Sequence, residues 1–306
     1  MRKLYTTWIL FLFSVCITLH AQTNRALIIA VSDYPVESGW EKTHAVNDCD
    51  LVIPMLEANG YQQADIQVLK NEEATKQAIV NTIRELTAAV QPGDYIYLQF
   101  SGHGQQMADD NGDELDQLDE AFIPYDAHFR FTPGKYEGEN HLRDDELELL
   151  MDGIRRRTGE KGNLTIVLDA CHSGTGTRNN EEDEYVRGTS YIFAPDDFDV
   201  YTDNFGPIKL NLNKSPGLSP VTVFSACQPD QLNYEYRTPT RPVSYYGSLS
   251  YFFCELVKEQ KTEASVQTFY LRLKDKMEKH FRKKGKEQSP YFESTDKNLI
   301  FRLNNY

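Results

Sequence analysis

Residues 94–104, DYIYLQFSGHG, and residues 163–174, NLTIVLDACHSG, decide the fold of this chain. Each stretch begins with a short apolar run typical of a buried strand and ends in a histidine or a cysteine close to glycine. A helical pattern at 144–157 lies between them. A strand, a helix and a further strand in succession predict neighbouring parallel strands of one sheet.

The same alternation continues on both sides of these two strands. Further strands are predicted at 25–32, 65–69 and 221–226, and further helices at 44–58, 71–90, 246–258 and 264–284. Residues 172–219 interrupt the pattern with a polar stretch that contains repeated Gly, Asn and Pro, which predicts a long exposed loop. We therefore expect an α/β fold with a doubly wound, mostly parallel β-sheet flanked by helices.

The composition is that of an acidic globular protein. The 306 residues include 46 acidic and 32 basic side chains, a formal net charge of -14, so no overall basic surface for nucleic acid is expected. Residues 109–126 hold eight carboxylates and no Lys or Arg. Such a run usually forms a solvated loop, and a cation site is the narrower alternative.

Residues 1–21 have the pattern of a secretory signal peptide. Arg2 and Lys3 precede an apolar run at 8–19, and Ala21 precedes a polar segment. The run is shorter than the roughly 20 residues of a spanning helix, so no stable membrane span is expected. We expect cleavage near Ala21, a secreted or periplasmic protein and one domain over 22–306. The remaining cysteines are too few for a disulfide framework and include no CxxC zinc motif.

His103 and Cys171 are the candidate reactive residues. The carboxyl ends of neighbouring parallel strands meet at one edge of a sheet, so we expect the imidazole and the thiol there together. A thiol that attacks and an imidazole that handles the proton suffice for nucleophilic catalysis. Each residue alone is more often structural, and their joint placement favours catalysis. His172 is the alternative base, but adjacent side chains of an extended segment point in opposite directions. A zinc site of Cys49, His103, Cys171 and His172 lacks the usual ligand spacing.

Four ordered motifs resemble those of the metacaspases, the caspase-like cysteine peptidases of the peptidase C14, clan CD type. They are VNDC at 46–49, SGHG at 101–104, DACHSG at 169–174 and SACQPDQ at 225–231. The resemblance covers residues 25–257 and is closest to a minimal, exported bacterial metacaspase. It implies a large-subunit-like part at 22–175, a linker at about 176–219 and a small-subunit-like part at 220–306.

The resemblance also implies roles for individual residues. Cys171 would be the nucleophile and His103 the general acid for the leaving amine, while the N–H groups of Cys171 and Gly104 would form the oxyanion hole. Asp48, Ser101 and Asp169 match positions that line the pocket for the residue before the cleaved bond, called P1. Two carboxylates there favour Arg or Lys. The alternatives are a helix cap for Asp48 and a backbone-bonded strand end for Asp169.

The resemblance implies calcium as an activating cofactor and no organic cofactor. The matching calcium ligands are Asp119, Asp144 and Asp145, and a further family ligand falls at Arg178, close to the carboxylates of 181–183. The expected partners are protein or peptide substrates with a basic P1 residue. Arg178 or Arg187 in the long loop would then be a site of self-cleavage. The alternative function is a non-proteolytic caspase-fold module that binds calcium or a partner.

Overall fold

The computed structural model describes residues 22–304 except 113, 115, 172–184, 200–211 and 229–230. The predicted signal peptide at 1–21 therefore lies outside the described residues. Within the described ranges, no helix combines the length and the apolar character needed to cross a membrane.

A six-stranded sheet forms the centre of the molecule, with the strand order β11-β8-β7-β3-β1-β2. All neighbouring strands are parallel except β11, which pairs antiparallel with β8. The strands are β1 (Asn24–Ala30), β2 (Ile66–Lys70), β3 (Tyr95–Ser101), β7 (Asn163–Asp169), β8 (Val221–Ser225) and β11 (Tyr291–Ser294). The predicted α/β fold with a mostly parallel sheet is thus confirmed.

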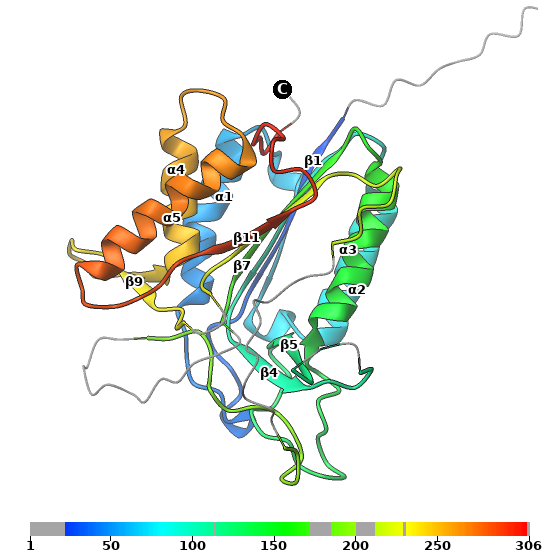
Figure 1. Cartoon of the computed structure of the whole chain (residues 1–306), viewed down its shortest axis with the longest axis vertical. Coiled ribbons are helices and arrows are strands. Elements are labelled where there is room, and N and C mark those ends of the chain that lie inside the picture. Colours follow the sequence, from blue (N-terminus) through cyan, green and yellow to red (C-terminus); the bar gives the residue numbers. More distant parts are fainter. Residues whose placement is uncertain are drawn as a thin grey trace, which may run out of the picture.

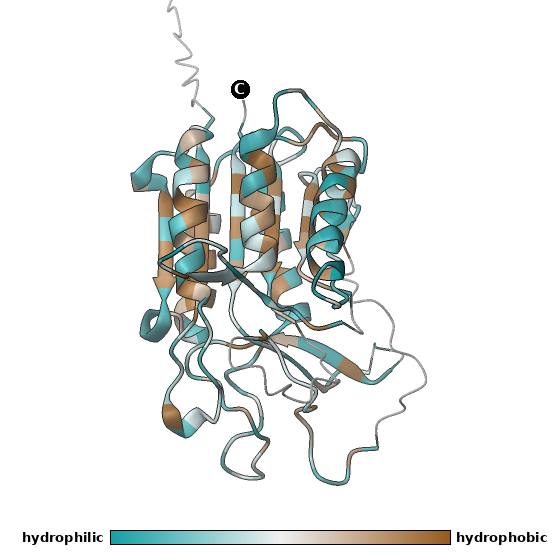
Figure 2. Ribbon diagram, turned by 90° about the vertical axis from the view of Figure 1, so that its left-hand side faces the viewer, coloured by the Kyte–Doolittle hydropathy of each residue, from teal (hydrophilic) through white to brown (hydrophobic). Residues whose placement is uncertain are grey.

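Helices cover both faces of this sheet (Figure 1). One face carries α1 (Cys49–Ala58), α4 (Ser248–Glu259) and α5 (Val266–Arg282), and the other carries α2 (Lys76–Ala89) and α3 (Asp144–Thr158). The strands serve both layers because successive side chains point to opposite faces. Ile28 of β1 packs with the first helix layer, and its neighbours Leu27 and Ile29 pack with the second. Figure 2 accordingly shows largely hydrophobic central strands.

The register of β3 and β7 positions the two candidate reactive residues. Ser101 at the end of β3 lies directly opposite Asp169 at the end of β7. His103 and Cys171 each follow this pair by two residues, so the chain delivers both to the carboxyl edge of the sheet. The expectation that these neighbouring strands end at one edge is therefore correct.

The acidic stretch at 109–126 is not simply a solvated loop, which corrects the usual expectation for such a run. It contains β5 (Leu118–Phe122), all of whose residues are buried. This strand pairs with β4 (Gly104–Ala108) and β6 (Leu142–Arg143) in a small antiparallel sheet below the carboxyl edge (Figure 1). Leu118, Ala121 and Phe122 give the strand enough apolar surface to bury its acidic neighbours.

The connection from β7 to β8 is also less exposed than its composition predicts. Its described parts are 185–199 and 212–220, and within them Arg187 and Phe193 are fully buried. Phe193 exchanges backbone hydrogen bonds with Gln106 and Ala108 beside β4. Further along, the hairpin of β9 (Glu235–Arg237) and β10 (Tyr245–Gly247) leads into α4. The exposed setting expected for Arg187 is therefore wrong, and Arg178 lies outside the described residues.

Candidate active site

His103 lies between β3 and β4 in an aromatic setting. Its Nε2 is 2.9 Å from the Glu41 carbonyl oxygen, and Trp40 stacks on the imidazole with ring centroids 4.9 Å apart. Its backbone N–H donates to the Tyr34 hydroxyl at 3.1 Å. These contacts hold the ring from two sides and fix its orientation.

The Glu41 contact also determines the tautomer of His103. A carbonyl oxygen only accepts hydrogen bonds, so Nε2 carries the proton and Nδ1 keeps its lone pair. Nδ1 is buried and has no hydrogen-bond partner among the described residues. Burial lowers the pKa of His103 to about 4, which keeps the ring neutral at physiological pH. The ring therefore presents a proton acceptor at Nδ1.

Cys171 lies just past the end of β7 and is buried. Its Sγ lies 3.0 Å from the Gln231 carbonyl oxygen and 3.1 Å from Cys227 Sγ. Its backbone N–H donates to the Arg187 carbonyl oxygen at 2.7 Å. None of the cysteines in the described ranges forms a disulfide. His172 lies outside those ranges.

Three carboxylates surround the guanidinium of Arg187 next to Cys171. Asp48 Oδ2 lies 2.6 Å from Arg187 Nη1, Asp169 Oδ1 lies 3.7 Å from the same nitrogen, and Glu235 Oε1 lies 3.1 Å from Nε. All four side chains are fully buried. We call Asp48, Asp169 and Glu235 the carboxylate pocket.

The carboxylate pocket depends on a cation. Burial alone lowers the pKa of Arg187, but the three carboxylates outweigh it and hold that pKa above its usual value. Burial alone would raise the pKa of Glu235, but the contacts with Arg187 and His44 outweigh burial and hold this pKa below its usual value. Without a guanidinium or ammonium group, three buried negative charges would face one another, which is strongly unfavourable.

Neighbouring residues hold the carboxylates in place. The Ser250 hydroxyl lies 2.7 Å from Asp169 Oδ2 and 3.1 Å from Asp48 Oδ2, and the Gly247 N–H donates to Asp48. The side chain of Asp48 forms no cap bond to α1. Asp169 accepts from Ser250 and from the side chain of Asn233. Both carboxylates also accept backbone N–H groups, Asp48 from Gly247 and Asp169 from Ser250, so their assignment to a P1 pocket stays a prediction.

Ser101 and Gly104 are the remaining predicted site residues, and both are buried. Ser101 is buried beside Asp169 in the sheet register, where its hydroxyl accepts from Gln99 at 2.9 Å. Gly104 is buried as the first residue of β4, directly after His103.

The segment that carries Arg187 binds in an extended conformation. The Arg187 N–H donates to the Asn233 carbonyl oxygen and the Glu235 N–H donates to the Tyr185 carbonyl oxygen, both at 2.9 Å. Val186 and Tyr234 form an antiparallel bridge between these bonds. The 185–187 segment therefore adds to the chain before β9 as a short extra strand, a common mode of peptide binding.

Gly188 brings the Arg187–Gly188 peptide bond against Cys171. A Cβ at position 188 would lie 2.3 Å from the Cys171 carbonyl oxygen and 2.9 Å from Cys171 Cβ, so only glycine fits this approach. On the other side of the Arg187 guanidinium, position 247 likewise has room only for glycine. A Cβ there would lie 2.1 Å from Asp169 Oδ2 and 2.4 Å from Arg187 Nη1.

The candidate calcium residues lie near β5 and α3. Asp109, Asp110 and Asp119 offer carboxylate oxygens within 4.8 Å of one another, whereas Asp144 and Asp145 at the start of α3 are outside this triad in the described structure. Arg143 pairs with Asp119 and with Asp110.

Negative charge is concentrated around this triad. Burial, together with the neighbouring Asp145, raises the pKa of Asp144 to about 7. Burial also raises the pKa of Glu120, with Asp144 and Asp116 as neighbours that add to the effect. Carboxylate oxygens are the donors that calcium prefers, so the chemistry of this region fits a divalent cation.

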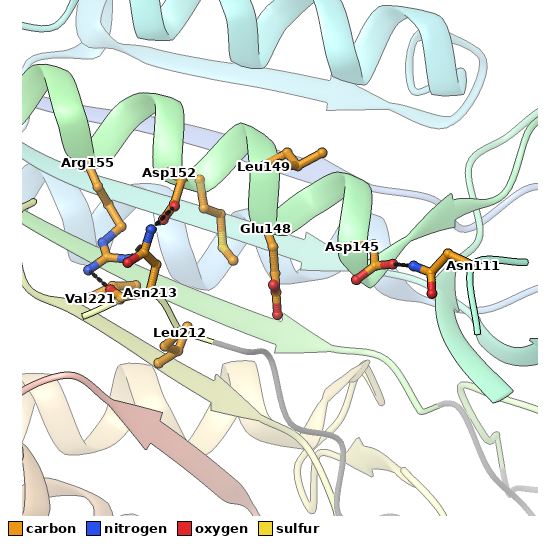
Figure 3. Close-up of a pocket in the computed structure, with 10 residues that line it drawn as sticks. Asn111, Asp145, Glu148, Leu149, Asp152, Arg155, Leu212, Asn213 and Val221 are labelled. Carbon is orange, nitrogen blue, oxygen red and sulfur yellow. Dashed lines mark hydrogen bonds and ion pairs between the residues drawn. The ribbon is translucent and has the colours of Figure 1, made fainter. Parts of the chain in front are cut away.

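A pocket of about 290 Å³ lies beside α3 and β8, and the candidate calcium residue Asp145 is part of its lining. Figure 3 shows Asp145, Glu148, Asp152 and Arg155 along α3, with Leu212 and Asn213 across from the helix. The Arg155 guanidinium donates to the carbonyl oxygens of Ser219 and Asn213, which fastens the chain before β8 to α3. Neither His103 nor Cys171 lines this pocket, and we assign it no catalytic part.

A histidine and a cysteine at the carboxyl edge of a parallel sheet, beside a pocket for one side chain, define a class of protein. It is the class of caspase-like proteins. Sequence comparison agrees, because the family model described as "Caspase domain" matches residues 23–300. The chain belongs to this family.

Similar curated proteins are metacaspases. Metacaspase-2 of Arabidopsis thaliana is 29% identical over 247 residues, which cover 78% of this chain and 53% of that protein. Metacaspase-1A of Neurospora crassa is 30% identical over 159 residues, covering 50% of this chain and 32% of that protein. The chain thus spans about half or less of the length of these relatives. The expected metacaspase-like family is confirmed, whereas bacterial origin and export stay predictions.

Solved structures share the fold. Caspase-1 from Spodoptera frugiperda superposes with a TM-score of 0.55 at 14% identity, covering 93% of this chain and 91% of that one. A crystal structure of a Geobacter sulfurreducens protein superposes with a TM-score of 0.58 at 20% identity, covering 89% and 93%. At these identities the likeness concerns the fold alone.

Several residues of the site have no clear signal in the sequence. Arg187 stands in a polar loop, and only the folded chain shows that its side chain is buried among carboxylates. Asn233 differs from the small apolar residue usual in the family. Its amide bonds Asp169 and its backbone carbonyl receives the Arg187 N–H, so the site uses its polarity.

Proposed function

We propose that this chain is a cysteine endopeptidase that cleaves peptide bonds after Arg or Lys. The observation that supports a basic P1 residue is the burial of Arg187 in the carboxylate pocket, with its carbonyl oxygen on the N–H of Cys171. A substrate Arg in the same position would satisfy the same three carboxylates.

We propose the following reaction for these two residues. His103 Nδ1 takes the proton of the Cys171 thiol, and the thiolate sulfur attacks the carbonyl carbon of the P1 residue. The developing oxyanion is held by the Cys171 N–H, joined by the N–H of Gly104 in our proposal. The C–N bond then breaks, and protonated His103 gives its proton to the leaving amine. Water, deprotonated by His103, hydrolyses the resulting thioester and restores the thiol.

We propose further that the enzyme processes itself at the Arg187–Gly188 bond. Its peptide bond already lies against Cys171, and the side chain of Arg187 fills the carboxylate pocket. While this segment stays in place, no other substrate enters. Cleavage and departure of the 185–187 segment would open the site, so the uncut chain acts as its own inhibitor.

Calcium is proposed as an activating cofactor. Asp109, Asp110 and Asp119 would supply oxygen ligands, and the concentrated charge of Asp144 and Asp145 would favour a cation nearby. A bound dication would neutralise these carboxylates and so stabilise the loops between β4 and α3. Thermal unfolding with calcium and with chelator tests this apart from activity.

Export is proposed from the pattern of residues 1–21. N-terminal sequencing of the protein recovered from outside the cytoplasm of an expressing bacterium is expected to begin near Gln22. Recovery only as full-length protein in the cytoplasm would overturn this proposal.

The experiment that tests the function compares fluorogenic peptides with Arg, Lys or Asp at P1. Wild type and Cys171→Ala are assayed, each with calcium and with chelator. We expect cleavage after Arg and Lys, none after Asp and none in the variant. A folded wild type that cleaves nothing in any condition would favour the binding-module alternative.

Self-processing has its own test. Purified protein is incubated and followed by mass spectrometry, and we expect a single break after Arg187 that is absent in Arg187→Gln and in Cys171→Ala. Arg241→Gln removes an exposed basic side chain and is the matched control, which is expected to break like wild type. An intact wild-type chain under conditions in which it cleaves peptides would refute self-processing at this bond.

A further inference from the structure

The 185–187 segment shows how a substrate would lie in the site, and it contains one more side chain that the chain binds. Alternate residues of a strand point to the same side. Tyr185, two residues before Arg187, therefore faces the same wall of the site as the guanidinium. Val186 between them points the other way.

The Tyr185 ring packs against two other aromatic rings. Its ring centroid lies 4.4 Å from that of His44, with the planes at 85°, and 5.0 Å from that of Tyr245, with the planes at 72°. His44 and Tyr245 stack on each other at 4.8 Å. The edge-to-face contacts that result are a favoured geometry for aromatic pairs.

Both receiving rings are fixed by the rest of the site. Glu235 accepts from the His44 backbone N–H at 2.7 Å, and its other oxygen lies 2.6 Å from His44 Nδ1. Tyr245 belongs to β10, and its backbone carbonyl receives the side chain of Asn47 at 2.9 Å. A rigid pair of rings binds a third ring with little loss of conformational freedom.

Tyr185 remains 36% exposed, so its ring lies at the surface rather than in the core. Glu235 contacts both His44 and Arg187. The same residue therefore borders the position of the Tyr185 ring and the position of the Arg187 guanidinium. Once the 185–187 segment has left, the side chain of a separate peptide could reach the rings of His44 and Tyr245 at this surface position.

We propose that His44 and Tyr245 form an aromatic subsite for the third residue before the cleaved bond, P3. The enzyme then prefers substrates with an aromatic residue two positions before a basic residue. This inference rests on the proposed function, because it names a second determinant of the same substrate.

The first test compares two peptides, Tyr-Val-Arg and Ala-Val-Arg, with the same fluorogenic leaving group. Wild type is expected to show a kcat/KM about tenfold higher for the tyrosine peptide, about 1.4 kcal/mol, in the range of one to two aromatic contacts. Tyr245→Ala is expected to lose this preference, so that its kcat/KM values for the two peptides become equal. Tyr246→Ala alters the neighbouring residue of β10 and is expected to keep the preference.

Equal cleavage of the two peptides by wild type would overturn the P3 subsite and leave the proposed function standing. Failure to cleave either peptide would instead count against the proposed function.

A second test needs no catalysis by this protein. In the Cys171→Ala background, trypsin is used to cut after Arg187, a bond that is protected while the segment stays bound. Tyr185→Ala is expected to raise the rate of this cut several-fold, and Tyr185→Phe is expected to leave it unchanged. An unchanged rate in Tyr185→Ala would show that the two rings do not hold the segment, which would overturn the subsite.

Discussion

Asp48→Asn tests whether the carboxylate pocket binds a positive charge. The substitution keeps the volume of the side chain and removes one negative charge from the pocket. Asp48 contacts both terminal nitrogens of Arg187, with Oδ2 2.6 Å from Nη1 and Oδ1 3.3 Å from Nη2, and both side chains are fully buried. This is the shortest of the three contacts between Arg187 and the pocket.

The size of the effect follows from this geometry. Removing one partner of a buried ion pair costs about 3–5 kcal/mol. Asp169 and Glu235 still face the guanidinium in the variant, so we take the lower end, about 3 kcal/mol, which corresponds to a loss of about 150-fold in kcat/KM.

The assay uses two peptides that differ only in charge at P1, one with Arg and one with its neutral analogue citrulline. Rates are referred to the concentration of reactive Cys171, titrated with an alkylating reagent. Wild type is expected to prefer Arg strongly, and Asp48→Asn is expected to reduce that preference by about 150-fold. Asp50→Asn, an exposed neighbour on α1, is the matched control and is expected to behave as wild type.

One result would refute the reasoning. If Asp48→Asn slows the Arg and citrulline peptides to the same extent, the carboxylate supports the fold of the site and does not recognise charge. A circular dichroism spectrum identical to that of wild type would show that the variant is folded.

Three further outcomes are expected. Gly247→Ala places a Cβ 2.1 Å from Asp169 Oδ2, and such overpacking costs about 1–3 kcal/mol. KM for Arg peptides should therefore rise about ten- to hundredfold. An unchanged KM would contradict the assignment of the carboxylate pocket to the P1 side chain. The proton acceptor His103 has a pKa of about 4, so kcat/KM should rise with pH through about 4 and stay high at pH 5. Trp40→Ala exposes the His103 ring to water and should move this rise toward the ordinary histidine pKa of about 6.5. A wild-type rise centred on pH 6.5 would contradict the burial argument. Calcium should raise the unfolding temperature of wild type but not of Asp119→Asn, and an equal rise in both would place the ion elsewhere.

Much of the fold was predictable because its signals are local. Five strands of the central sheet are short apolar runs, and the helices show a clear apolar face, so these elements could be located without knowledge of their neighbours. The edge strand β11 (Tyr291–Ser294) has no such run and was not predicted. The approach of His103 and Cys171 followed as well, since both come directly after neighbouring parallel strands.

Features that depend on contacts between distant segments were not predictable. β5 lies in an acidic run and is held by pairing with β4 on one side and β6 on the other. Arg187 is buried by carboxylates that come from three separate parts of the chain. Neither periodicity nor composition reports such partners, because a single charged residue looks the same whether it ends in solvent or in an ion pair.

The position of β8 has a consequence for the chain after a break at Arg187. β8 lies inside the central sheet, between β7 and β11, and Phe193 packs against Met107 of β4. The piece after the break also supplies α4 and α5 to the core. A chain cleaved after Arg187 should therefore give two bands on a denaturing gel. In native mass spectrometry it should still be detected as one complex of the two pieces. When the two pieces are expressed as separate chains in one cell, they should associate into the folded protein, as the halves of a split protein do.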